Sequence, residues 1–159
     1  MGKKIAKAGF ELIKSFEGCR LTAYKCPAGV WTIGYGHTGR VRGLKIKEGL
    51  KISHKKADAL LKRDLRVFQK SVNKAKIGFR PNQNQFDALV SFTFNVGPGN
   101  LNRLLSNGSR DAKTVADKMV LYNKANGKEL TGLTRRRKEE QKLFNNASRV
   151  NNRGKVDTL

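Results

Sequence analysis

The stretch FEGCRLTAYKCPAGVWTIGYGHTG, at residues 16–39, decides the fold of this chain. It begins at the end of an amphipathic pattern over residues 4–17, where apolar side chains recur at helical spacing and Gly18 supplies a stop. Over residues 20–38 the pattern changes to a period of two, which is typical of β-strands, and residues 27–29 supply a turn. The sequence therefore predicts a helix that leads into a tight β-hairpin.

Three side chains in this stretch carry chemistry. Glu17 lies at the predicted helix end, and Cys26 and Thr32 follow on the hairpin. A carboxyl that gives a proton, a second ionisable group that engages a water and a hydroxyl that holds it are the minimum for breaking a glycosidic bond with inversion. The partial negative charge at the carbonyl end of a helix favours the protonated form of Glu17, which a general acid needs.

The spacing of these residues resembles the catalytic set of phage-type lysozymes, glycoside hydrolase family 24. In that family a Glu is followed after eight residues by Asp or Cys and after five more by Thr, and this chain matches with the Cys version. The surrounding TIGYGHT matches as well, as do NQNQFDALVSFTFNVG at residues 82–97 and GLTRRRKEEQKLF at residues 132–144. The resemblance covers most of the chain and implies that Glu17, Cys26 and Thr32 are catalytic.

The resemblance also implies residues that bind substrate. Phe94 and Asn95 match positions that line the substrate cleft of the family, and Arg136 lies in a segment that matches the family. Arg136 could also pair with Glu17, which would favour the charged form of that carboxyl and oppose the effect of the helix end. The sequence leaves open which of the two effects is larger.

The rest of the chain predicts an α+β protein. Apolar patterns indicate helices at residues 53–75, 86–96, 111–124 and 135–146, with caps at Ser53, at Asn82 with Gln85, and at Thr134. We expect a single lysozyme-like domain with a β-containing lobe at about residues 1–52 and a helical lobe at about residues 53–149. A long helix joins the lobes, a cleft lies between them, and residues 150–159 form a polar tail.

His37 and Asp64 are predicted to support the site structurally. Asp64 falls on the apolar stripe of the helix predicted at residues 53–75, and a carboxylate there needs a partner. The family resemblance places His37 near this helix. We therefore expect an ion pair between the two side chains.

The composition points to anionic partners. The chain has 159 residues, with 34 Lys and Arg against 12 Asp and Glu, and a formal net charge of +22. Such a charge attracts polyanions, which include nucleic acids and the anionic polymers of a bacterial envelope. The basic residues are spread along the chain without a nucleic-acid-binding motif, so nucleic acid is not the predicted target. The charge could also serve only to keep a small protein soluble.

Neither a metal nor a cofactor is predicted. Cys19, Cys26 and the two histidines show no spacing typical of a zinc site. The basic N-terminal residues lack the pattern of a secretory signal. We expect a monomer made in a bacterial cytoplasm, where free thiols are favoured over a disulfide.

The resemblance implies a muramidase that hydrolyses the β-1,4 bond between N-acetylmuramic acid and N-acetylglucosamine in peptidoglycan. It further implies a phage or prophage endolysin, made without a signal peptide in the host cytoplasm and reaching the wall after a holin opens the inner membrane. Glu17 would protonate the leaving oxygen. Cys26 and Thr32 would engage a water on the opposite face of the sugar, which gives inversion.

Two other functions remain open at this point. Cys26 as nucleophile with a histidine as base would give a peptidoglycan peptidase or amidase, although that scheme leaves Glu17 and Thr32 without a role. The second of these functions is that of a basic nucleic-acid-binding domain. The products of wall digestion distinguish the two enzymes: a muramidase releases reducing ends of glycan, whereas a peptidase or amidase releases new amino groups.

Overall fold

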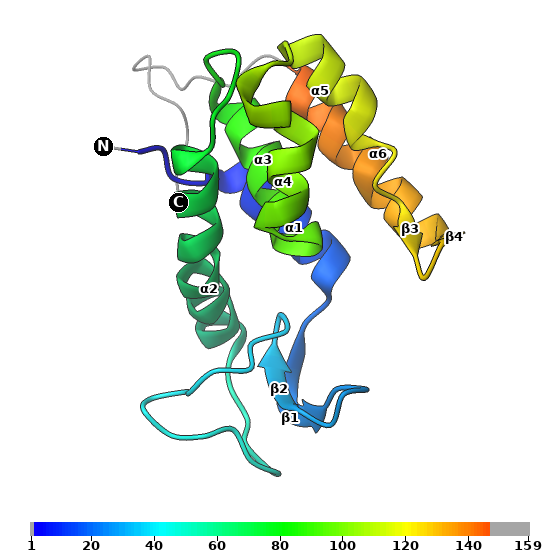
Figure 1. The fold of residues 1–159 in the computed structure, drawn as a ribbon. Coiled ribbons are helices and arrows are strands. Elements are labelled where there is room, and N and C mark those ends of the chain that lie inside the picture. The colour runs from blue at the N-terminus through cyan, green and yellow to red at the C-terminus, as the bar shows by residue number, and fades with distance from the viewer. Residues whose placement is uncertain (1, 147–159) are drawn as a thin grey trace. The chain divides into compact units, whose positions relative to one another are not determined.

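The computed structural model describes residues 2–146, so the polar tail predicted at residues 150–159 lies outside the described residues (Figure 1). The described chain forms two compact units, one of residues 14–66 and one that combines residues 2–13 with residues 67–146. The division falls inside two helices, α1 (Lys7–Glu17) and α2 (His54–Lys74). Within residues 2–146, no helix is both long enough and apolar enough to cross a membrane.

The smaller unit contains the predicted hairpin. β1 (Arg20–Lys25) and β2 (Trp31–Gly34) pair antiparallel, with Tyr24 opposite Thr32. Ile33 is fully buried, and Gly34 approaches α2 so closely that an added Cβ would lie 3.4 Å from the Cβ of Ala57. The hairpin is therefore packed against the start of α2.

The start of α2 has the cap that the sequence predicted. The hydroxyl of Ser53 accepts a hydrogen bond from the backbone N–H of Lys56 at 3.1 Å. The apolar stripe of α2 is buried, and its members include Ala57, Leu60, Leu61, Leu65 and Val72.

The larger unit is built around α3 (Gln83–Val96), which is buried on most sides. Asn82 and Gln85 form the predicted capping box at its start. The other elements of this unit are α4 (Pro98–Leu105), a 3₁₀ turn (Ser106–Gly108), α5 (Ala112–Met119), β3 (Lys124–Ala125), β4 (Lys128–Glu129) and α6 (Thr131–Asn145). Helices and small antiparallel sheets together confirm the predicted α+β class.

Two predictions in the larger unit were wrong. No helix was predicted between residues 96 and 111, yet Pro98 begins α4, because proline is tolerated in the first helical turn. Thr134 was expected to cap the last helix, but α6 begins three residues earlier and lacks a side-chain cap. The hydroxyl of Thr134 instead accepts a hydrogen bond from the Asn123 amide at 3.0 Å.

The start of α1 is held by a buried carboxylate, Asp87 of α3. Its Oδ1 accepts from the backbone N–H of Ala6 at 3.1 Å, and its Oδ2 accepts from that of Gly9 at 3.2 Å. These N–H groups have no partner inside the helix, so Asp87 caps α1 from a neighbouring element. Gly9 is required for this contact, since a Cβ there would lie 2.5 Å from the Cβ of Asp87. α1 therefore begins at Lys7 rather than at residue 4.

This cap predicts a pH dependence of stability. Burial raises the pKa of Asp87 to about 6, against the opposing effect of its hydrogen bonds with Ala6, Gln83 and Gly9. The folded protein then holds a proton that the unfolded chain releases near pH 4. The corresponding free energy of unfolding, about 3 kcal/mol, is present at low pH and is lost as pH rises through about 6.

Denaturant unfolding of the wild type and of Asp87→Asn at pH 4 and pH 7 measures this effect. We expect the variant to be less stable at both values but to lack the decrease between them. An identical decrease in both proteins would show that Asp87 does not cause it.

Candidate active site

Glu17 is the last residue of α1, and it is half-buried. Gly18 follows with a φ of 66°, in the left-handed region that favours glycine. The helix ends there, and β1 begins two residues later at Arg20. The structure thus places the predicted acid at the carbonyl end of a helix, directly before the hairpin.

One backbone carbonyl, that of Val30, holds both Cys26 and Thr32. Its oxygen accepts from the backbone N–H of Cys26 at 2.9 Å and from the hydroxyl of Thr32 at 2.9 Å. The backbone N–H of Gly29 donates to the Cys26 carbonyl at 2.8 Å and closes the turn. The turn therefore brings together the second and third residues of the predicted catalytic set.

Hydrogen-bond donors around the sulfur favour the thiolate of Cys26. The backbone N–H of Val30, followed by that of Ala28, lowers the pKa of the thiol, desolvation opposes them, and the hydroxyl of Thr32 adds to the lowering. A hydroxyl has one hydrogen, so Thr32 donates at any moment either to the Val30 carbonyl or to the sulfur. Cys26 and Thr32 therefore act as one hydrogen-bonded unit.

The expected contact between His37 and Asp64 is present. His37 Nδ1 lies 2.8 Å from Asp64 Oδ2, and His37 Nε2 lies 3.1 Å from the carbonyl oxygen of Arg40. The backbone N–H of Ile33 donates to the His37 carbonyl, and that of His37 donates to the Ile33 carbonyl, both at 2.9 Å. The pair thus connects α2 to the strand residue that follows Thr32.

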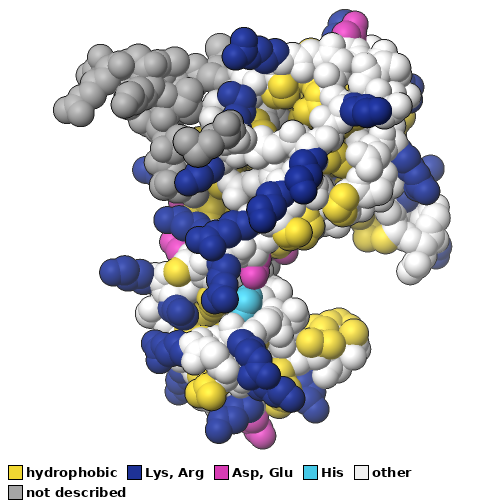
Figure 2. Space-filling view, turned by 60° about the vertical axis from the view of Figure 1, so that its left-hand side comes forward, with side chains coloured by type: hydrophobic (Ala, Val, Ile, Leu, Met, Phe, Trp, Pro, Cys, Tyr) yellow, Lys and Arg dark blue, Asp and Glu magenta, His cyan; other side chains and the backbone are white. Residues whose placement is uncertain are grey.

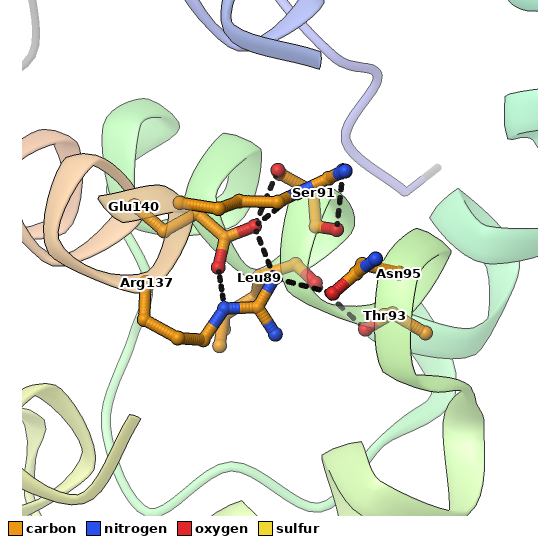
Figure 3. Close-up of polar contacts among 7 residues, drawn as sticks. Leu89, Ser91, Thr93, Asn95, Arg137 and Glu140 are labelled. Atoms are coloured by element: carbon orange, nitrogen blue, oxygen red, sulfur yellow. Dashed lines mark hydrogen bonds and ion pairs between the residues drawn. The ribbon is translucent and has the colours of Figure 1, made fainter. Parts of the chain in front are cut away.

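A buried ionic cluster joins α3 to α6 in the larger unit, and Figure 3 shows its side chains converging. Glu140 Oε1 lies 2.7 Å from Arg137 Nε. Glu140 Oε2 accepts from the Ser91 hydroxyl at 2.6 Å and from Arg136 Nε at 3.4 Å. Roles for Arg137, Glu140 and Ser91 were not predicted from the sequence. The spacing of Arg137 and Glu140 puts them on one helix face, but spacing alone does not show that the face is buried.

Arg136 and Arg137 both pair with Glu140 in this cluster. Burial lowers the pKa of Arg137, with Glu140 acting in the opposite direction. Burial likewise raises the pKa of Glu140, against the two guanidinium groups and the Ser91 hydroxyl. Removing one member of such a buried pair leaves an uncompensated charge, which costs about 3–5 kcal/mol. The cluster therefore fixes how α3 packs against α6.

The remaining predicted residues belong to this unit. Phe94 is half-buried, and its ring packs edge-to-face on Phe68 with centroids 5.2 Å apart. Asn95 is exposed, and its Oδ1 accepts from Arg137 Nη2 at 2.8 Å. Arg136 is only 4% exposed and contacts Glu140 and the carbonyl of Ser91. Substrate binding by these residues stays a prediction. Across residues 2–146, no group of three His, Cys, Asp or Glu side chains is arranged to hold a metal ion.

The sequence also matches a family of known proteins. The family model for phage lysozyme matches residues 14–140. The chain belongs to the phage lysozyme family.

Relatives and a solved structure agree with this membership. The endolysin of Bacillus phage PZA is 42% identical over 155 residues, which cover 93% of this chain and 57% of that protein. The endolysin of Salmonella phage P22 is 36% identical over 144 residues, which cover 89% of this chain and 97% of that protein. The muramidase domain of SpmX from Asticaccaulis excentricus superposes with a TM-score of 0.79 at 40% identity, over 92% of this chain and 100% of that one. The chain thus spans little more than half the length of the PZA relative.

The surroundings of Cys26 predict its reactivity. We expect the rate of alkylation by iodoacetamide to rise with a pH midpoint below about 8.5, the ordinary value for a cysteine. Thr32→Val should move the midpoint upward, because one donor to the sulfur is lost.

The measurement uses a Cys19→Ser background and follows the modified mass with time at a series of pH values. A midpoint at or above that of free cysteine would contradict this description of the turn.

Proposed function

We propose that this protein is a lysozyme that hydrolyses the β-1,4 bond between N-acetylmuramic acid and N-acetylglucosamine in peptidoglycan. The observation that carries the proposal is the hairpin turn that joins Cys26 to Thr32, directly after a helix that ends in Glu17. Family membership over residues 14–140 supports it. So do the relatives, which are endolysins and a muramidase domain.

In the proposed reaction, Glu17, Cys26 and Thr32 each have one role. Glu17 donates its proton to the glycosidic oxygen, and the bond from that oxygen to C1 of the sugar breaks. A water attacks C1 from the opposite face, and its proton passes to the Cys26 thiolate. The Thr32 hydroxyl orients the water through a lone pair that remains free when its hydrogen is donated. Direct attack by water inverts the configuration at C1.

The arrangement of the histidine argues against the peptidase alternative. A Cys–His enzyme needs a ring nitrogen that can accept the thiol proton. Both nitrogens of His37 are engaged, one with Asp64 and one with the Arg40 carbonyl. The other histidine is placed beside the other cysteine, since His54 Nδ1 lies 4.0 Å from the sulfur of Cys19. The glycosidase scheme uses Glu17, Cys26 and Thr32, whereas the peptidase scheme uses only one of them.

The basic surface supports a role in attraction to the wall. Figure 2 shows Lys and Arg side chains spread over the visible face with few acidic neighbours, in line with the net charge of +22. We assign this surface to the anionic polymers of the envelope, with peptidoglycan as the substrate and nucleic acid excluded as the functional target. By analogy with endolysins, the monomer would be made in the host cytoplasm and reach the wall after a holin opens the inner membrane.

Salt should weaken attachment to walls steeply, because the screening length falls from about 10 Å at 0.1 M to about 3 Å at 1 M. Sedimentation of the Glu17→Gln protein with purified walls at both salt concentrations measures the bound fraction without hydrolysis. An unchanged bound fraction would leave the charge without a role in attachment.

Glu17→Gln should abolish wall hydrolysis while the protein stays folded, because an amide cannot donate the proton that the leaving oxygen needs. General acid catalysis contributes about 10²- to 10⁴-fold, so the loss should be of that size. Turbidity of a suspension of purified walls follows the reaction.

Glu11→Gln is the matched control, since Glu11 is an exposed residue of the same helix, and it should keep its activity. Retention of more than about a tenth of wild-type activity by Glu17→Gln would remove Glu17 from the role of acid.

A further inference from the structure

A loop in the smaller unit carries four basic residues around one exposed leucine. Its sequence is RVRGLKIK, at residues 40–47, and it contains no acidic residue. Val41 and Ile46 are buried and anchor the loop, whereas all four cations are exposed. Leu44 is 71% exposed, the largest fraction among the large apolar side chains of residues 2–146. The loop therefore displays an apolar side chain between positively charged residues.

A tight turn holds Leu44 in place. The backbone N–H of Val41 donates to the Leu44 carbonyl at 2.9 Å, and that of Leu44 donates to the Val41 carbonyl at 3.0 Å. The two central residues, Arg42 and Gly43, have φ angles of 51° and 77°, in the left-handed region. The Arg40 guanidinium donates to the Gly43 carbonyl at 3.1 Å. Asn or Gly suits the first central position, and an arginine there costs free energy. The stability of the turn therefore does not account for Arg42, and the exposed cation points to a partner.

The loop borders a hollow of about 350 Å³ that it shares with the hairpin. Val30 and Trp31 line the hollow from the hairpin, and Arg40 and Lys45 line it from the loop. Its other lining residues are Thr38, Gly39 and Ile46. Val30 is 45% exposed, and Trp31 is half-buried with Lys25 Nζ 5.3 Å from the centroid of its ring. Among the described residues, no acidic side chain lines the hollow, so apolar and cationic groups share one surface.

The apolar side chains decide which kind of partner fits this surface. A soluble polyanion would use the cations alone and would leave Leu44 and Val30 in water. A bilayer with anionic lipids complements both kinds of group, because its phosphates attract cations and the boundary of its acyl chains takes up apolar side chains. Tryptophan is enriched at that boundary, since its ring is apolar and its N–H can still reach water. Hollows of this size hold small ligands, and a phosphate-bearing headgroup is the small anionic part of a lipid.

We propose that residues 40–47, together with Val30 and Trp31, form a docking surface for a bilayer that contains anionic phospholipids. A headgroup phosphate enters the hollow between Arg40 and Lys45, while Leu44 and Val30 reach the boundary of the acyl chains. The protein then lies on the membrane surface rather than across it. This inference goes beyond the proposed function, because it names a second partner and requires no glycan.

Sedimentation with lipid vesicles tests the proposal. One set of vesicles contains equal parts of phosphatidylglycerol and phosphatidylcholine, and the other contains phosphatidylcholine alone. Trp31 is the only tryptophan of the chain, so its fluorescence reports directly on this surface. We expect binding to the anionic vesicles only, with a shift of the Trp31 emission to shorter wavelength and quenching by brominated acyl chains.

Leu44→Ser should weaken binding to anionic vesicles by about tenfold, because the apolar side chain is no longer there to be buried. Arg42→Gln combined with Lys45→Gln should weaken it by about fivefold for each cation removed. Leu121→Ser is the matched control, since Leu121 is 66% exposed in the larger unit, and it should bind as the wild type does. In a Glu17→Gln background, Leu44→Ser should leave sedimentation with purified walls unchanged.

Equal binding to both kinds of vesicle, or binding to neither, would overturn the proposal. So would unchanged affinity of Leu44→Ser, an equal loss in Leu121→Ser, or a Trp31 emission that does not shift on binding. Loss of wall binding by Leu44→Ser to the same extent would overturn it in favour of wall polymers as the partner. Release of reducing ends from walls reports on the proposed function, and the vesicles contain no glycan, so the two can fail independently.

Discussion

The candidate site depends on one carbonyl oxygen, that of Val30, which bonds to both the Cys26 backbone and the Thr32 hydroxyl. Because the same turn directs the N–H groups of Val30 and Ala28 toward the sulfur, local backbone geometry lowers the thiol pKa. An aspartate at this position would ionise at neutral pH without these hydrogen bonds, whereas the thiolate of a cysteine is favoured by them. The lowered pKa favours the thiolate that the proposed mechanism requires of Cys26.

The larger unit relies on buried carboxylates that are paired across elements. Asp87 of α3 satisfies the start of α1, and Glu140 of α6 binds Ser91 of α3 and two arginines. Such groups are strongly destabilising when a partner is removed, so they define one packing of the helices. At Asn95 this packing extends to the surface, where it fixes the orientation of an exposed amide.

Local signals in the sequence predicted local features. The cap at Ser53, the turn before Thr32 and the α+β class followed from residue types that act within a few positions. The helix that begins at Pro98 was missed, because a proline can begin a helix as well as follow the end of one. Arg137 of α6 and Asn95 of α3 lie 42 positions apart in the chain, and neither residue type predicts their contact. Pairings of this kind are set by tertiary packing, which the pattern of one helix does not contain.

The central claim is that the site breaks a glycosidic bond rather than an amide bond, and the products of wall digestion test it most directly. Purified walls are incubated with the wild-type protein, and new reducing ends and new free amino groups are quantified together with the masses of the released fragments. We expect fragments that end in reducing N-acetylmuramic acid, with no increase in amino groups. New amino groups without new reducing ends would contradict it.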